Sequence, residues 1–351
     1  MSKTYLITGA NSGLGFDATR QLALRNDVQT VFMACQSEEK AQKAIDDLVQ
    51  LGVSKTKLRF IPFDGSSSKS QIIQAVANSL PLGTVLDGIV LNAGGIGHDT
   101  VGRPTKPNHI LPIVQINLAA HVHLVEYLRS QDHLKKNHSR IIYVGTEGSR
   151  GIPFIGMKSP DFVGDTPDYF KSYIDGSAYN TTTTTTSSSN KNNNKNNNKN
   201  NKNNNKNNNK NKYDPMAVYP EAKGLATLYF SAWARQHPQY FVLTVSPGGT
   251  KGTSFAHQEA MNPMMSVIFP IMMKVFGAFG KFHSLKIGAK RYVDAVTGEG
   301  EFRHFLSGSF VASKKGVAGP VADQVEVFAT AKQYGDVKKQ DAVYAAMQEY
   351  L

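Results

Sequence analysis

The chain has 351 residues, of which 40% are hydrophobic, enough for one large α/β domain or two small ones. Its one cysteine excludes a disulfide framework and a cysteine-based zinc site. The net charge of +12 falls to +5 without seven lysines of one low-complexity stretch, and no nucleic-acid-binding motif accompanies it. We therefore expect no nucleic-acid partner. Because an apolar segment starts at Tyr5 with no leader-like stretch before it, we also expect a cytoplasmic location.

Strand-like and helix-like segments alternate along the chain. Short apolar runs, typical of buried strands, cover residues 4–8, 30–34, 57–63, 88–92, 140–145 and 240–246. Amphipathic stretches, typical of helices, cover residues 14–25, 38–51, 68–78, 113–131 and 219–236. This order predicts an α/β fold with a doubly wound parallel sheet and helices on both faces, in a single domain spanning residues 1–351.

Two segments depart from this alternation. Residues 181–212 are a Thr run, a Ser run and Asn/Lys repeats, with nothing apolar to bury, so we expect a disordered surface insertion; an interaction arm is the alternative. Residues 261–282 are rich in Met and Phe but interrupted by prolines and a lysine, too often for a membrane span. A lid over an apolar substrate, plain packing, and peripheral contact with a membrane or partner all remain open. We assign residues 256–351 to a substrate lid and C-terminal extension.

A glycine-rich turn follows the first apolar run and opens the first amphipathic stretch. It reads Thr8-Gly9-Ala10-Asn11-Ser12-Gly13-Leu14-Gly15. Glycines there allow a tight turn and a close approach of the backbone to a pyrophosphate, whose charge the helix N-terminus would face. Such a turn is also compatible with a simple strand-to-helix connection, so it needs support from the rest of the chain.

Further motifs occur in order at the ends of later segments. They are Asp64 after the third run, Asn92-Ala93-Gly94 after the fourth, Asn117 in the 113–131 stretch, Tyr219-Pro220-Glu221-Ala222-Lys223, and Pro247-Gly248 with Thr250 and Thr253. In this order they resemble the short-chain dehydrogenase/reductase family over residues 4–255, the insertion excepted. The tail and the long loop before Tyr219 are most similar to the protochlorophyllide-reductase and retinol-dehydrogenase branch.

The resemblance implies a Rossmann-type fold, a homo-oligomer, and two sets of site residues. The implied catalytic residues are Tyr219, Lys223, Thr146 and Asn117. The implied cofactor-binding residues are Thr8, Gly9, Asn11, Ser12, Gly13, Leu14, Gly15, Gln36, Asp64, Asn92, Ala93, Gly94, Tyr219, Lys223, Pro247, Gly248, Thr250 and Thr253.

Carbonyl reduction leaves negative charge on oxygen that must gain a proton. A free Tyr has a pKa near 10, and a Lys ammonium one helical turn away, with an oxidised nicotinamide, would lower it. We therefore expect Tyr219 to act as general acid in reduction and general base in oxidation. The resemblance further implies that Lys223 holds the nicotinamide ribose and that Asn117 positions a water.

The fourth member of the family's tetrad is usually a Ser that polarises the substrate carbonyl. Here Gly145 and Thr146 stand where the family has a Ser pair. A Thr hydroxyl can donate and accept the same hydrogen bonds, so we expect Thr146 to serve, with Ser149 as the alternative.

The cofactor choice depends on the end of the second strand. An acidic residue there would bind the ribose hydroxyls of NAD and repel the 2′-phosphate of NADP. Cys35 and Gln36 are not acidic, and Ser37 and Lys40 follow closely. We therefore favour NADP(H) over NAD(H).

These features predict an oxidoreductase that reversibly reduces a carbonyl or oxidises an alcohol on a small to medium lipophilic substrate. Two alternatives stay open: a catalytically silent dinucleotide-binding regulator or scaffold, and an NAD-dependent epimerase or dehydratase. No histidine or carboxylate pattern indicates a metal site.

Overall fold

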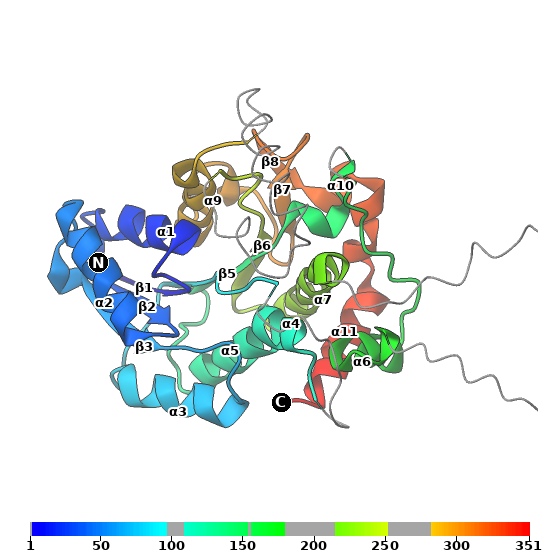
Figure 1. Ribbon diagram of the computed structural model, residues 1–351, viewed down its shortest axis with the longest axis horizontal. Coiled ribbons are helices and arrows are strands. Elements are labelled where there is room, and N and C mark those ends of the chain that lie inside the picture. The colour runs from blue at the N-terminus through cyan, green and yellow to red at the C-terminus, as the bar shows by residue number, and fades with distance from the viewer. Residues whose placement is uncertain (1, 97–108, 154–155, 180–214, 252–281) are drawn as a thin grey trace, which may run out of the picture.

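The computed structural model describes residues 2–96, 109–153, 156–179, 215–251 and 282–351. Its centre is a sheet of eight strands in the order β3-β2-β1-β4-β5-β6-β7-β8 (Figure 1). The strands are β1 (Lys3–Thr8), β2 (Val28–Cys35), β3 (Leu58–Pro62), β4 (Gly88–Leu91), β5 (Arg140–Val144), β6 (Phe241–Val245), β7 (Phe310–Ser313) and β8 (Val321–Asp323). All neighbours pair in parallel except β7 and β8, which are antiparallel. The winding direction reverses between β1 and β4, as in a Rossmann-type fold.

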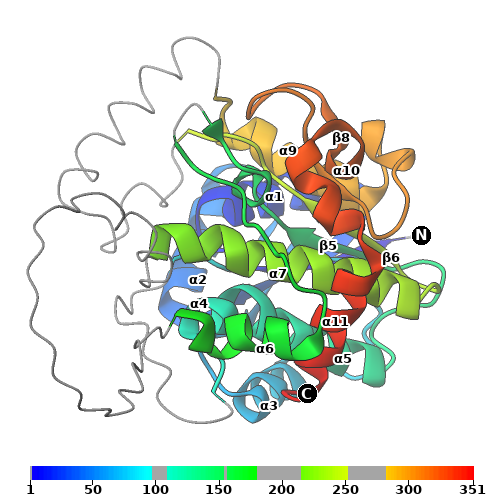
Figure 2. The same cartoon turned by 90° about the vertical axis from the view of Figure 1, so that its right-hand side faces the viewer.

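Helices cover both faces of this sheet. They are α1 (Gly13–Ala23), α2 (Glu38–Gln50), α3 (Lys69–Ser79), α4 (Pro112–Val114), α5 (Ala120–Ser130), α6 (Pro167–Asp175), α7 (Pro215–Gln236), α9 (Leu285–Thr297), α10 (Gln324–Val327) and α11 (Val337–Gln348). Figure 1 shows α1 and α9 on one side of the sheet and α3 and α5 on the other. Figure 2 shows α7 crossing the molecule, with α6 and α11 packed along it.

Strand alternation explains the two layers. Along β1, Tyr5 and Ile7 belong to the hydrophobic cluster under α1, α2 and α9, whereas Leu6 belongs to the cluster under α3, α5 and α7. Successive side chains of a strand point to opposite faces, so a sheet covered on both sides needs continuous apolar runs. The strands nearest the centre have this composition, which is why the sequence reveals them.

The six predicted strands and the five predicted helices are all present, each within a few residues of the expected bounds. The predicted stretch 113–131 is not one regular helix, because α4 leads into a π-helical turn, η2 (Gln115–Ala119), before α5 begins. The sequence analysis did not find β7, β8, α6, α9, α10 or α11. Residues 181–212 and nearly all of 261–282 lie outside the described residues. Within the described part of the chain, no helix is long and apolar enough to cross a membrane.

The contact between β7 and the C-terminal segment provides a test of this packing. Phe310 is 1% exposed and meets the Tyr334 ring edge-on at 5.4 Å between centroids. We expect Phe310→Ala to lower the free energy of unfolding by about 3–5 kcal/mol, since it removes a fully buried ring. Leu306→Ala, at a side chain 79% exposed, should change it by less than about 0.5 kcal/mol in the same urea titration. Equal effects of the two substitutions would contradict this packing.

Candidate functional site

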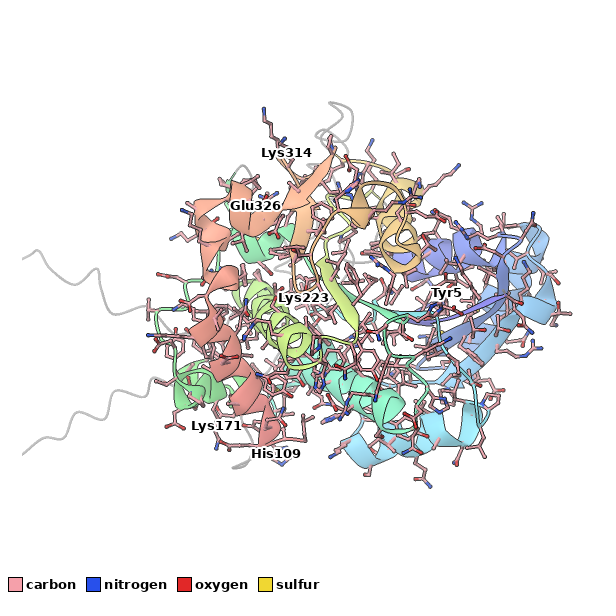
Figure 3. The ribbon with its side chains drawn as sticks, turned by 180° about the vertical axis from the view of Figure 1, so that it is seen from behind. Tyr5, His109, Lys171, Lys223, Lys314 and Glu326 are labelled. Carbon is pink, nitrogen blue, oxygen red and sulfur yellow. The ribbon has the colours of Figure 1, made fainter. Side chains whose placement is uncertain are left out.

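Most of the predicted site residues of the described chain follow the carboxyl ends of β1 to β6, and the winding direction reverses between β1 and β4. In open α/β sheets this edge is where ligands bind. Asn117 comes from η2, and Tyr219 and Lys223 come from α7. Figure 3 places Lys223 near the middle of the molecule on α7, in contrast to Lys314 at the rim. Thr253 lies outside the described residues.

The glycine-rich turn is built for close approach. Gly9 and Gly13 have φ values of +65° and +55°, which side chains disfavour. A Cβ at Gly15 would lie 2.2 Å from the carbonyl oxygen of Gly9, so the first turn of α1 needs a glycine at this position to pack against the glycine-rich turn. Ser12 is the N-cap of α1 but makes no side-chain cap bond. The first amide groups of this 11-residue helix are therefore not capped by Ser12, and they can serve an anion.

Asn92 and Thr8 tie the ends of β1 and β4 together. The Asn92 side chain donates to the carbonyl oxygens of Thr8 at 2.9 Å and Gly9 at 3.3 Å. The Thr8 hydroxyl accepts from the amide of Ala93 at 2.9 Å. The residues after β4 thus hold the glycine-rich turn in place through hydrogen bonds.

Lys223 and Asn117 meet at Gly94. Lys223 Nζ donates to the carbonyl oxygen of Val144 at 2.9 Å and lies 4.9 Å from the ring centre of Tyr143. A Cβ at Gly94 would lie 3.1 Å from this Nζ and 2.5 Å from Asn117 Oδ1, so a glycine is required at 94. Tyr219 lies one turn before Lys223 on α7.

The π-helical turn directs the Asn117 side chain into this site. Asn117 Nδ2 donates to Ile113 O at 2.8 Å and Gly95 O at 2.7 Å, and Oδ1 accepts from the Gly95 amide at 3.1 Å. The hydroxyl of Tyr143 donates to the main-chain oxygen of Asn117 at 2.8 Å. The side chain of Asn117 therefore holds the loop after β4 in place beside Lys223.

The loop after β5 distinguishes Thr146 from Ser149. Thr146 is half-buried and caps η3 (Glu147–Arg150), its hydroxyl accepting from the Gly148 amide at 3.1 Å. Ser149 is fully buried, and its hydroxyl donates to Pro220 O at 3.3 Å. A Cβ at Gly145 would lie 2.6 Å from Thr244 Cγ2, which explains the absence of a Ser there. The geometry therefore favours Thr146 over Ser149 as the hydroxyl facing a substrate.

Burial dominates the electrostatics of the site. It lowers the pKa of Lys223 to about 7. Burial also raises the pKa of Tyr219, and the negative charge of Glu147 raises it further. The sequence analysis counted the effect of Lys223 on the phenol but could not count this desolvation, which acts in the opposite direction.

The end of β2 has the predicted non-acidic residues. Cys35 is buried in the core, and burial raises its pKa to about 11. Gln36 donates to Asp64 Oδ2 at 3.3 Å. Burial acts to raise the pKa of Asp64, but hydrogen bonds from Ser66 and Gln36 lower it on balance. The carboxylate of Asp64 thus lies close to Gln36 although it comes from another strand.

The turn after β6 packs against His283, a residue that the sequence analysis missed. Gly248 has a φ of +80°, and a Cβ there would lie 2.7 Å from the ring of His283. His283 Nε2 is 2.6 Å from Pro247 O, and Thr250 Oγ1 donates to Gly248 O at 3.1 Å. His283 stands directly before α9 and carries no motif that would have revealed it.

Glu147 and Arg291 form a second missed feature. Glu147 Oε1 lies 3.5 Å from Arg291 Nη1, and both side chains are buried. Glu147 directly follows Thr146, whereas Arg291 comes from α9, far along the chain.

Among the described residues no cluster of His, Cys, Asp and Glu could hold a metal ion.

Comparison with known proteins finds similarity to short-chain dehydrogenases. The family described as short chain dehydrogenase matches residues 3–157. A short-chain dehydrogenase/reductase of Neocamarosporium betae is 30% identical over 177 residues, covering 48% of this chain and 49% of that protein. A short-chain dehydrogenase of Penicillium roqueforti is 36% identical over 99 residues, covering 28% of this chain and 25% of that one. The chain thus spans about half or less of the length of these two relatives.

Solved structures show the same fold. Salutaridine reductase from Papaver somniferum superposes with a TM-score of 0.55 at 17% identity, covering 88% of this chain and 99% of that one. A blue fluorescent protein from a metagenomic library, in complex with NADPH, gives a TM-score of 0.55 at 16% identity, covering 90% and 98%.

The buried ammonium of Lys223 leads to a prediction about stability. An unfolded Lys has a pKa of about 10.4, so between about pH 7 and pH 10 the unfolded chain binds a proton here that the folded chain has lost. Raising the pH through this window therefore stabilises the wild type. Lys223→Met should be most stabilising, relative to the wild type, near pH 7. This advantage should shrink by about 1.4 kcal/mol per pH unit as the pH rises, in urea titrations at several pH values.

Lys332→Met is the control, because Lys332 is exposed. It should differ from the wild type by the same amount at every pH. If the Lys223→Met difference were equally flat, Lys223 would not hold a desolvated ammonium group.

Proposed function

We propose that this chain belongs to the short-chain dehydrogenase/reductase family and is an oxidoreductase that interconverts a carbonyl group and an alcohol with a nicotinamide cofactor. The observation that carries the proposal is the meeting of Lys223 and Asn117 at Gly94, with Tyr219 one turn away and Thr146 on the neighbouring strand end. The groups come from four separate segments of the chain, with Tyr219 and Lys223 together on α7, and folding brings them to one edge of the sheet.

The nucleotide is proposed to lie along the carboxyl ends of β1, β2 and β4. The uncapped start of α1 and the bare backbone of Gly9, Gly13 and Gly15 fit a pyrophosphate, since no Cβ stands in its way. Gln36 and Asp64 would face the adenosine end, and the Pro247-Gly248 turn with Thr250 the nicotinamide end. When bound, the cofactor supplies the hydride acceptor or donor.

The chain's own residues would manage the proton and orient the substrate. The raised pKa keeps Tyr219 protonated at neutral pH, so its hydroxyl can give a proton to the carbonyl oxygen during reduction. Thr146 would donate a hydrogen bond to the same oxygen. Because the pKa of Lys223 is about 7, its ammonium can exchange a proton near neutral pH and return a proton to the Tyr219 phenolate.

NADP(H) is the proposed cofactor, because β2 ends in Cys35 and Gln36 without a carboxylate of its own. The lipophilic substrate rests on the composition of residues 261–282, which lie outside the described chain. Peripheral membrane contact, a homo-oligomer and the protochlorophyllide-reductase or retinol-dehydrogenase branch likewise stay predictions. The intact Tyr219 and Lys223 favour turnover over a silent scaffold.

A fluorescence titration with NADPH and NADH, at one fixed ionic strength, tests the nucleotide site. We expect saturable binding of both, with tighter binding of NADPH, because Cys35 and Gln36 place no carboxylate of β2 itself against the 2′-phosphate. Gly15→Val should abolish binding of both, since its side chain would enter the Gly9 turn. Tighter binding of NADH would refute the proposed preference, and a folded protein that bound neither would refute the site.

Substitution of Tyr219 tests the chemistry. We expect Tyr219→Phe to lower turnover of aldehydes and ketones by about a hundredfold or more while NADPH affinity stays within about twofold, because only the proton donor is lost. Thr146→Ser should retain most activity, and Thr146→Val should lose it, since only the first keeps a hydroxyl. Unchanged turnover in Tyr219→Phe would overturn the mechanism.

A further inference from the structure

Glu147 and Arg291 form a buried ion pair behind the proposed active site. Their side chains are 4% and 7% exposed, and Glu147 Oε1 lies 3.5 Å from Arg291 Nη1. Glu147 belongs to η3 and follows Thr146 directly, whereas Arg291 lies on α9. Neither residue belongs to any motif of the proposed catalytic or nucleotide site.

Glu147 connects the loop after β5 to the two neighbouring strands. Its Oε2 accepts from the hydroxyl of Ser246, the last residue before the Pro247-Gly248 turn. Its Oε1 accepts from Ser313 at the end of β7, from the amide at 3.3 Å and from the hydroxyl at 3.0 Å. One carboxylate therefore links the strand ends of β5, β6 and β7.

Arg291 completes the same network from the helix side. It donates to Ser246 O at 3.1 Å, to the Ser313 hydroxyl at 3.0 Å and to Gly319 O at 2.9 Å. A Cβ at Gly248 would lie 2.8 Å from Arg291 Nη1, so the guanidinium packs directly against this turn. Arg291 therefore contacts the Pro247-Gly248 turn directly, beside His283.

The free energy of folding alone does not explain why a buried ion pair stands here. Taking two charges out of water costs several kcal/mol per ion, and apolar residues of the same size often stabilise a core as well or better. A pair that fixes the relative position of two loops has a different use. Here those loops carry Thr146 on one side and the proposed nicotinamide-facing turn on the other.

We propose that Glu147 and Arg291 are positioning residues that hold Thr146 and the Pro247-Gly248 turn in register beside Tyr219. This inference rests on the proposed function, because it gives those two loops their roles. Neither residue touches the reacting atoms in the proposed scheme. Both act through the main chain that they hold.

The pair also sets the charge that Tyr219 meets. Burial is the larger cause of the raised pKa of Tyr219, and the carboxylate of Glu147 raises it further, which keeps the phenol protonated. The charged and titratable groups that interact with Glu147 are Arg150, Tyr219, His283, Arg291 and Tyr292. A purely structural pair would leave the proton donor's titration unchanged when its charges are removed, so this titration separates the two roles.

The test uses the full chain with Glu147→Gln, Arg291→Met, the double variant, and Lys290→Met as control. Lys290 precedes Arg291 on α9 but is 61% exposed, in an ion pair with Asp294. For each protein we measure the dissociation constant for NADPH, the pH dependence of p-nitrobenzaldehyde reduction, and the urea unfolding midpoint. The wild type is measured first.

Glu147→Gln keeps the shape of the side chain and one of its two oxygens but removes the charge. Lys223 titrates near pH 7, so the decline of reduction that belongs to Tyr219 is the one at higher pH. We expect this upper decline to move to lower pH by about half a unit or more, because the Tyr219 phenolate no longer meets the charge of Glu147. For Arg291→Met we expect NADPH to bind about tenfold more weakly, because Ser246 and Gly319 lose the donor that holds the turn. Lys290→Met should match the wild type within about twofold.

The outcomes separate the two proposals. A folded wild type that binds neither NADPH nor NADH refutes the proposed function before any variant is made. If the wild type binds, and the folded variants keep its dissociation constant and alkaline limb while losing only unfolding midpoint, the pair is structural and this inference is wrong. Should Glu147→Gln or Arg291→Met not fold, the double variant and Arg291→Lys provide the same readouts. Affinity for NADPH needs no substrate, so it decides the matter even if p-nitrobenzaldehyde is a poor one.

Discussion

The ammonium group of Lys223 is buried at the centre of the molecule, where the carbonyl oxygen of Val144 and the ring of Tyr143 face it. A buried cation needs such partners, and they in turn require β5 to end beside α7 and Gly94 to lack a side chain. The tight packing around this one charge explains why glycine, asparagine and tyrosine residues from distant parts of the chain converge here. The same burial brings the pKa of Lys223 close to neutral pH, which a proton-exchanging residue needs.

A parallel sheet makes this convergence possible. Its strands all end at one edge, so the loops after β1, β4, β5 and β6 lie side by side although they are far apart in sequence. Short polar contacts then lock the loops to each other: Asn92 to the glycine-rich turn, Asn117 to Gly95, and Glu147 to Ser246. Helix α7 contributes the Tyr219 and Lys223 side chains, and the loops at the strand ends contribute the backbone that lies close to them.

A buried lysine and a buried carboxylate both act on Tyr219. Lys223 lies on the same helix one turn later, and the buried carboxylate of Glu147 acts from the other side. The carboxylate is itself paired with Arg291, so among the described residues a buried ion pair accompanies the desolvated ammonium of Lys223. Such an arrangement suits a proton donor in carbonyl reduction, since the phenol stays protonated while a neighbour can resupply its proton.

The sequence by itself determined the first six strands, the helices between them and the order of the motifs, because these depend on local periodicity and on glycines at fixed offsets. It did not reveal β7 or β8: β7 has four residues, and β8 has three that are only half-buried, too short for a pattern. Only the tertiary structure revealed the burial that raises the pKa of Tyr219 and the pairing of Glu147 with Arg291. For Thr146, which the sequence already preferred to Ser149, it added that the Ser149 hydroxyl is buried and bonded to Pro220. These depend on burial and on contacts between distant segments, and neither is encoded in the spacing of residues along one stretch of chain.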